Sequence, residues 1–242
     1  MNDRYAGDIG DYGKLGLLRQ LTSTGLSIGV NWYLTQDKSH GNDGQFVDYL
    51  HNDAYRQYDP PLWDALRQIV FSGERAVHVL EESSVLDAVY YSTPLAYSSQ
   101  ARAERLNQRR QWHDDAVHHL KDCELIFADP DIGLLVPSAD GTVRDVHYAY
   151  PEELLAYYHM GKSVIYYQHK ARLPDEFYLQ QHRQLFLDNT NAKGLCIRFN
   201  RISLRYFNFI IQPQHAERII RCIHNTVASP WGNCFSILND AD

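Results

Sequence analysis

Short apolar runs bounded by turn residues alternate with longer amphipathic segments along most of the chain. A short apolar run between turn signals suits a strand that is buried on both faces, as in a parallel sheet. Such runs predict strands over residues 26–34, 75–80, 124–128 and 162–167. Segments with helical length and periodicity predict helices over residues 15–21, 46–52, 61–71, 100–121, 151–159, 175–187 and 215–226.

The C-terminal third departs from this alternation. Residues 195–200 and 204–211 read as a β-hairpin, and residues 231–238 read as a last strand or a docked tail. The pattern predicts an α/β fold: a Rossmann-like, mostly parallel sheet with helices on both faces and a C-terminal antiparallel hairpin, which supplies one antiparallel edge strand. Because no Pro-, Gly- or Ser-rich linker divides the chain, we expect a single domain over residues 1–242.

The strand over residues 124–128 ends abruptly in Asp129-Pro130-Asp131. Proline cannot continue a strand ladder, and ligands of open α/β sheets bind beyond the carboxyl ends of the strands. We therefore expect Asp129 and Asp131 at the mouth of an active site. His169 follows the strand over 162–167 and should lie at the same mouth. The alternative is a tight turn, in which Asp and Pro are common.

The N-terminal segment Gly7-Asp8-Ile9-Gly10-Asp11-Tyr12-Gly13-Lys14 combines glycines and acids around one lysine. Glycine permits close approach of the backbone to a ligand, and Lys14 is long enough to reach a carboxylate or a phosphate. A flexible N-terminal arm is the alternative interpretation.

The signals for a nucleotide cofactor are weak. No GxGxxG follows the first predicted strand; Gly41-Asn42-Asp43-Gly44 is the nearest glycine-containing segment and is also a plain turn sequence. Glu81 follows the predicted strand over 75–80, where many such folds place the acid that binds ribose hydroxyls. The acids and serines after that strand are equally typical of a helix N-terminus.

Three arginines, Arg102, Arg105 and Arg109, fall on one face of the helix predicted over 100–121. Such a face is able to bind the phosphates of RNA or DNA. It is also typical of a solvated helix surface, since acids dilute it at Glu104, Asp114 and Asp115.

Composition narrows the class of protein. The formal net charge of −7 argues against unspecific binding of nucleic acid over the whole surface. The four cysteines, Cys123, Cys196, Cys222 and Cys234, have no zinc-ligand spacing. No apolar run approaches the ~20 residues of a membrane span, so we expect no membrane contact and a cytoplasmic location.

The predicted element order resembles that of class I S-adenosylmethionine-dependent methyltransferases, in particular the large-subunit ribosomal RNA adenine-N6 methyltransferase J family. Residues 7–14 are similar to that family's Gly-Asn-His-Ala-Asp-Val-Leu-Lys segment at Gly7, Asp11 and Lys14. Asp129-Pro130-Asp131-Ile132 lies where the family has Asp-Pro-Pro-Tyr. Residues 206–213 (YFNFIIQP) are similar to its final strand.

The resemblance implies methylation of an amino group of a base in RNA or DNA. Asp129 would accept a hydrogen bond from that amino group, and Pro130 would shape the turn. Asp11 and Lys14 would face S-adenosylmethionine, and Glu81 would bind its ribose. Asn31 and Gly44 stand where the family has an Asp and a glycine loop, and Ile132 replaces an aromatic residue.

Two other functions are compatible with the same residues. Asp129, Asp131, Glu81 and His169 would suit a divalent metal, which predicts a metal-dependent hydrolase or nuclease. A catalytically silent adaptor would keep the fold and bind nucleic acid or protein through the Arg102–Arg109 face and the arginines of the predicted hairpin.

Overall fold

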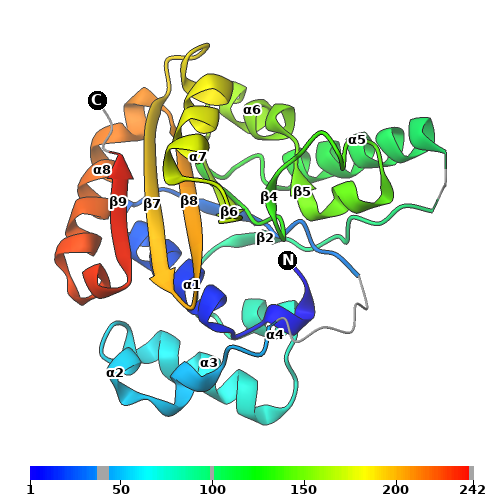
Figure 1. Ribbon diagram of the computed structural model, residues 1–242. Coiled ribbons are helices and arrows are strands. Elements are labelled where there is room, and N and C mark those ends of the chain that lie inside the picture. The colour runs from blue at the N-terminus through cyan, green and yellow to red at the C-terminus, as the bar shows by residue number, and fades with distance from the viewer. Residues whose placement is uncertain (37–43, 99–100, 240–242) are drawn as a thin grey trace.

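A seven-stranded sheet runs through the molecule and carries helices on both faces (Figure 1). The computed structural model describes residues 1–36, 44–98 and 101–239. The strands lie side by side in the order β2 (Val89–Tyr91), β1 (Ile28–Asn31), β3 (Leu125–Ala128), β6 (Ser163–His169), β8 (Ser203–Ile211), β7 (Lys193–Arg201) and β9 (Phe235–Asn239). The predicted α/β fold with a mostly parallel sheet is confirmed.

Strand directions change in the C-terminal third. The neighbours β2, β1, β3 and β6 run parallel, whereas β8 pairs antiparallel with both β6 and β7. The predicted hairpin is therefore present, and its second strand lies inside the sheet. The expectation of one antiparallel edge strand is wrong, because β9 adds a further antiparallel strand beyond β7. A second, two-stranded parallel sheet, β4 (Gly133–Leu134) with β5 (Tyr148–Ala149), lies against the end of β6 in the main sheet.

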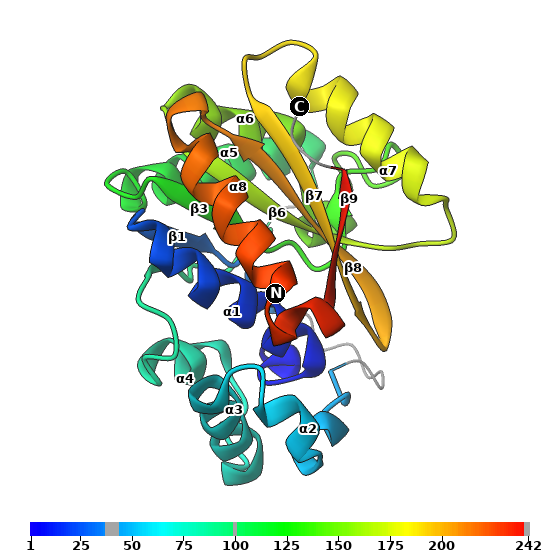
Figure 2. The ribbon, with the colours of Figure 1, turned by 90° about the vertical axis from the view of Figure 1, so that its left-hand side faces the viewer.

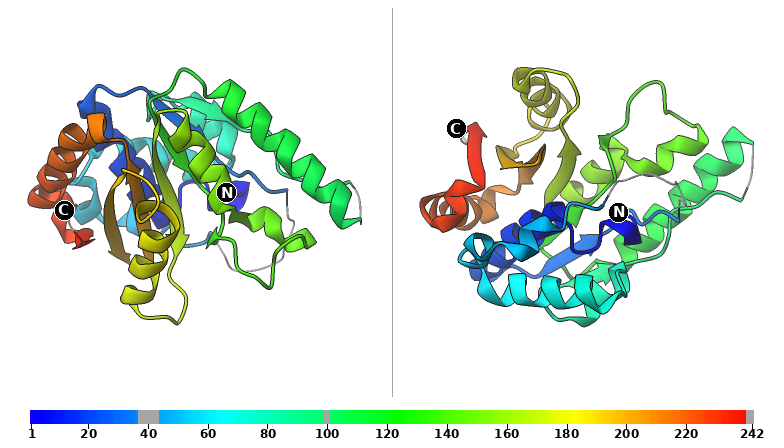
Figure 3. Two further views of the ribbon diagram at one scale, coloured as in Figure 1. Left: turned by 90° about the horizontal axis from the view of Figure 1, so that it is seen from above. Right: turned by 60° about the horizontal axis from the view of Figure 1, so that its bottom comes forward.

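The central strands separate two hydrophobic layers. Along β3, Leu125 and Phe127 face one cluster, and Ile126 and Ala128 face the other, as the period of two along a strand requires. The first cluster is completed by α1 (Ile9–Leu21), α3 (Pro60–Ser72), α4 (Val77–Glu82) and α8 (Pro213–Ala228). The second is completed by α5 (Arg102–His119) and α6 (Pro151–His159). Figures 2 and 3 show these helices on opposite sides of the sheet.

The remaining helices are peripheral. A short α2 (Asp53–Arg56) precedes α3, and α7 (Asp175–His182) lies beside the β7–β8 hairpin. Among the described residues, no helix has the length and apolar character needed to cross a membrane.

Two predicted elements differ from the structure. Residues 75–80 form no strand; α4 occupies this region, because Val77 and Leu80 lie three positions apart and are buried together. The strand that pairs with β1 on the side away from β3 is β2, which the sequence pattern did not indicate. Residues 46–52 are not one helix: a 3₁₀ turn, Asp48–His51, leads into α2.

The strand order reverses between β1 and β3. The chain passes from β1 to β2 on one side and later places β3 on the other side of β1. In open α/β sheets such a reversal leaves a crevice outside the carboxyl ends of the two strands, where ligands bind. Asn31 and Ala128 end the two strands, and Lys14 of α1 forms an ion pair with Asp129, directly after β3.

Candidate functional site

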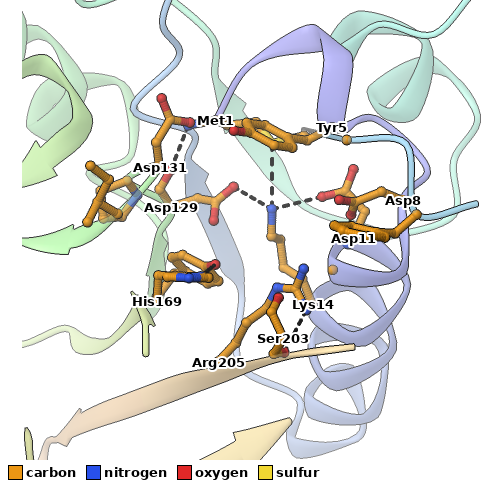
Figure 4. A pocket seen from close by; sticks show the side chains of 16 residues that line it. Met1, Tyr5, Asp8, Asp11, Lys14, Asp129, Asp131, His169, Ser203 and Arg205 are labelled. Carbon is orange, nitrogen blue, oxygen red and sulfur yellow. Dashed lines mark hydrogen bonds and ion pairs between the residues drawn. The ribbon is translucent and has the colours of Figure 1, made fainter. Parts of the chain in front are cut away.

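A cavity of about 270 Å³ lies at this reversal point. Its lining comes from the first residues of the chain, the N-terminal end of α1, the turn after β3, the end of β6 and the start of β8, together with Gly44 and Phe46. Figure 4 shows their charged side chains grouped around it. The lining includes Asp8, Asp11, Lys14, Asp129, Asp131, His169 and Arg205.

The first turn of α1 is fixed by its own carboxylates. Asp8 is the N-cap, and its Oδ1 accepts a hydrogen bond from the backbone N–H of Asp11 at 2.9 Å. The Asp11 carboxylate in turn accepts from the N–H of Gly7 at 3.0 Å. Gly7 has a φ of +79°, which glycine adopts without strain. The glycine-rich segment is therefore an ordered helix start and not a flexible arm.

Lys14 is buried between two carboxylates. Its Nζ lies 2.9 Å from Oδ1 of Asp11 and 2.6 Å from Oδ2 of Asp129, and 5.5 Å from the centre of the Trp32 ring. Burial alone would lower the pKa of Lys14, but the two carboxylates outweigh it and raise that pKa. Lys14 is therefore a fixed ammonium that holds α1 against the end of β3.

Asp129 uses only one carboxylate oxygen in this ion pair. Its Oδ2 accepts from Lys14, and no described residue donates a hydrogen bond to its Oδ1. Figure 4 shows the carboxylate beside the cavity. Burial raises the pKa of Asp129, and Lys14 opposes that rise. The residue thus presents a positioned acceptor to a ligand.

Asp131 is engaged more fully than Asp129. Its Oδ2 accepts from the hydroxyl of Thr35 at 3.0 Å and lies 2.7 Å from Nδ1 of His147, while the Met1 amino group lies 2.8 Å from Oδ1. Burial opposes ionisation, but the Met1 amino group and His147 hold the pKa of Asp131 well below its ordinary range. The second carboxylate of the turn therefore has a structural task in the described chain.

Burial, followed by the nearby charge of Asp11, raises the pKa of the Asp8 carboxyl to about 6. Between its ordinary value near 4 and this raised value, the folded state binds more protons than the unfolded state, so stability is lost as pH rises through this interval. The raised pKa corresponds to a loss of about 3 kcal/mol in the free energy of unfolding over this pH interval. Asp8→Asn keeps an N-cap acceptor and removes the charge. We expect urea titrations to show this loss in the wild type between pH 4 and 6.5 but not in Asp8→Asn; parallel curves would contradict it.

The structure brings together some of the predicted site residues but not all. Asp11, Lys14, Gly44, Asp129, Pro130, Asp131 and His169 line the cavity. Asn31 does not; its side chain donates to the hydroxyl of Tyr157 and accepts from the N–H of Tyr33. Glu81 lies on α4 and accepts from Nε1 of Trp32 and from the hydroxyl of Ser92. Residues 41–43 of the glycine-containing segment lie outside the described residues.

Arg205 and Phe46 also line the cavity; the sequence indicated Arg205 only as one of the hairpin arginines of the adaptor interpretation, and Phe46 not at all. Arg205 comes from β8, and no local motif marks it. Phe46 is 43% exposed and Ile132 is 39% exposed, so two large apolar side chains border the opening of the cavity. In the sequence, Phe46 is only an aromatic residue beside a turn, which is a weak signal for a site residue.

The proposed metal cluster is not formed. Within residues 1–36, 44–98 and 101–239, no three His, Cys, Asp or Glu side chains are placed to hold a metal ion. The ammonium of Lys14 occupies the space between Asp11 and Asp129, and Glu81 is bound elsewhere. The metal-site interpretation of Asp129, Asp131, Glu81 and His169 is therefore wrong for this arrangement.

The predicted basic face of α5 is also wrong. Arg105 and Arg109 are buried, and only Arg102 is exposed, where it pairs with Asp140. Arg109 donates to both carboxylate oxygens of Glu153, at 2.6 and 2.9 Å. Arg109 thus holds α5 against α6, while Arg105 donates to the carbonyl of Gly141, so the three arginines do not form one exposed basic face.

No family model matches the chain, and no curated protein matches it. Among solved structures, the chain is similar to protein LPL1258 from Legionella pneumophila str. Philadelphia 1, of the family model DUF519. The two share 11% sequence identity, 98% of each chain is covered, and the TM-score is 0.48.

Proposed function

We propose that the protein is an enzyme that acts on the exocyclic amino group of a nucleobase held in the cavity beside Asp129. The main support for this proposal is the Asp129 carboxylate. Lys14 fixes its Oδ2, while its Oδ1 has no donor among the described residues. A fixed carboxylate oxygen can accept a hydrogen bond from the amino group of a nucleobase.

The surroundings of Asp129 support a planar ligand. Asp129 lies at the reversal point of the strand order, where ligands of this fold class bind. Phe46 and Ile132 supply apolar surface at the opening, and base–aromatic stacking stabilises binding by ~1–3 kcal/mol. A base in RNA or DNA would have to leave its stack to reach this depth.

Two of the residues predicted to bind S-adenosylmethionine have other partners in the structure. Asn31 faces Tyr157, and Glu81 is held by Trp32 and Ser92. The Trp32 ring stacks on Tyr90 at 5.9 Å, with an angle of 4° between the rings, directly after β1. Bulky buried side chains therefore stand where a glycine loop would let a cofactor approach.

Methyl transfer is nevertheless the reaction to test first, because the sheet order and the Asp129-Pro130 turn agree with the resemblance described above. Titration calorimetry with S-adenosylmethionine and S-adenosylhomocysteine decides it. Saturable micromolar binding of both would support a methyltransferase. Failure of both to bind would exclude S-adenosylmethionine as the donor and leave amino-group recognition to be tested separately.

Asp129→Leu removes the acceptor and leaves Lys14 paired with Asp11. A hydrogen bond to a charged group is worth ~1.5–3 kcal/mol, so we expect adenosine or cytidine to bind about 10- to 100-fold more weakly to this variant. Purine riboside, which lacks the amino group, should bind equally weakly to both proteins. The measurement is calorimetry with nucleosides and with short single-stranded RNA and DNA.

The matched control is Asp145→Asn. Asp145 is a buried carboxylate outside the cavity that accepts hydrogen bonds from Tyr97 and Tyr150. We expect this variant to bind the nucleosides as the wild type does. Equal affinity of the wild type for adenosine and purine riboside would exclude a role for Asp129 in recognising the amino group.

A further inference from the structure

The guanidinium of Arg205 has donors that none of the described residues uses. Arg205 is 6% exposed, and its Nη1 donates to the backbone carbonyls of Arg201 at 3.3 Å and Ser203 at 3.0 Å. Among the described residues, none accepts a hydrogen bond from Nε or Nη2. Leaving N–H donors of a buried guanidinium without acceptors is costly, so this edge of Arg205 points to a ligand group that would accept from it.

The turn between β7 and β8 holds that edge in place. Both carbonyls that bind Nη1 belong to the hairpin turn, as Figure 4 shows for Ser203. With Nη1 anchored, Nε and Nη2 form the planar pair that binds a carboxylate or a phosphate through two parallel hydrogen bonds. The site is therefore preorganised.

The first turn of α1 lies against the same edge. A Cβ atom at Gly10 would lie 3.0 Å from both Nε and Nη2 of Arg205, so glycine keeps this space open. Gly10 lines the cavity, and none of the described residues accepts a hydrogen bond from its N–H. The N-terminus of a helix of 13 residues adds a partial positive charge.

We propose that the Nε–Nη2 edge of Arg205 and the first turn of α1 form an oxyanion subsite of the cavity, which binds a carboxylate or a phosphate group of the ligand. The subsite itself stands independently of the proposed function. The role of Asp129 as acceptor for an amino group rests on the proposed function. If both hold, the ligand carries an amino group and an oxyanion.

The charges around the subsite favour a singly charged group. Asp8 Oδ1 would lie 2.9 Å from the same Cβ position at Gly10, so a carboxylate faces the guanidinium across the gap. Lys14 is already balanced by Asp11 and Asp129. Arg205 therefore supplies most of the attraction for an anion.

The test measures the melting temperature with sodium phosphate, sodium acetate or sodium chloride at equal ionic strength. We expect a saturable rise with phosphate or acetate and none with chloride; which anion is stronger identifies the oxyanion. Arg205→Gln should weaken the response at least about tenfold, since the bidentate, charge-assisted pair is lost. Gly10→Ala should weaken it as well, because the added methyl group fills the gap and leaves the charge intact.

Arg198→Gln is the matched control. Arg198 lies on the neighbouring strand β7 and pairs with Asp175 at 2.6 Å, outside the cavity. It should respond to the anions as the wild type does. A response that is equal in wild type, Arg205→Gln and Gly10→Ala, or the lack of any response in the wild type, would overturn the subsite.

Adenosine and 5′-AMP separate this inference from the proposed function. If phosphate is the stronger anion, AMP should bind about tenfold more tightly than adenosine to the wild type, and this advantage should vanish in Arg205→Gln. If adenosine binds through Asp129 while neither anion does, the subsite is wrong and the proposed function stands. Binding of an anion without binding of adenosine leaves the subsite intact and contradicts the proposed function.

Discussion

Replacing Lys14 by methionine is expected to lower the free energy of unfolding by about 3–5 kcal/mol. The substitution keeps much of the volume but removes the ammonium that lies 2.9 Å from Asp11 and 2.6 Å from Asp129. Both carboxylates then remain buried without their cation, which is far more costly than the loss of an exposed ion pair. Urea unfolding followed by circular dichroism at pH 7 measures the difference.

Two further variants show whether charge is the cause. Lys121→Met removes an exposed lysine at the end of α5 and should change stability by less than about 0.5 kcal/mol. Adding Asp129→Asn to Lys14→Met removes one of the two stranded charges and should restore part of the stability. A double variant less stable than Lys14→Met alone would contradict this explanation.

On the other face of the sheet, Glu153→Ala is expected to lower the free energy of unfolding by ~3–5 kcal/mol as well. Glu153 is buried and accepts two hydrogen bonds from Arg109, one from the hydroxyl of Tyr33 at 3.1 Å and one from the N–H of Tyr150 at 3.0 Å. Its loss leaves the guanidinium of Arg109 in the interior, where the Asp145 side chain, the Tyr97 hydroxyl and backbone carbonyls are its remaining hydrogen-bond partners among the described residues.

The pH dependence follows from the same pair. Burial opposes ionisation of Glu153, but Arg109 outweighs it and lowers the pKa of the carboxyl. Its contribution to stability is therefore present above the ordinary pKa near 4.5 and is lost as pH falls through the lower, folded-state pKa. The gap between wild type and Glu153→Ala should narrow below pH 4. Glu152→Ala, at the exposed neighbouring position, should show neither effect.

The parts of the fold that follow from short-range pattern were predictable. The apolar run before Asp129 gives β3, and the run before His169 gives β6, since both strands are buried on both faces. The rule that ligands bind beyond the carboxyl ends of strands then places these two residues at one cavity, as found.

Elements whose identity depends on distant partners were not predictable. Strand β2 has three residues, and its Val89 is 45% exposed, so its pattern is weak. Arg109 reads as part of a surface stripe because its partner Glu153 lies 44 residues further along the chain. Arg205 reaches α1 only through the folding of the C-terminal hairpin, and no local motif marks that contact.

The cavity links the two hypotheses about the ligand. Asp129 offers an acceptor for an amino group, and Arg205 offers donors for an oxyanion, with Lys14 fixing the distance between α1 and β3. The rigid elements that carry these side chains favour recognition by a preformed site.

A crystal structure of the protein soaked with 5′-AMP or with the nucleoside that binds most tightly tests the central claim most directly. We predict density for the ring in the cavity, with its amino nitrogen within hydrogen-bond distance of Oδ1 of Asp129. A ring bound with its amino group away from Asp129, or at another site such as the groove beside Trp63 and Arg67, would contradict the proposed function.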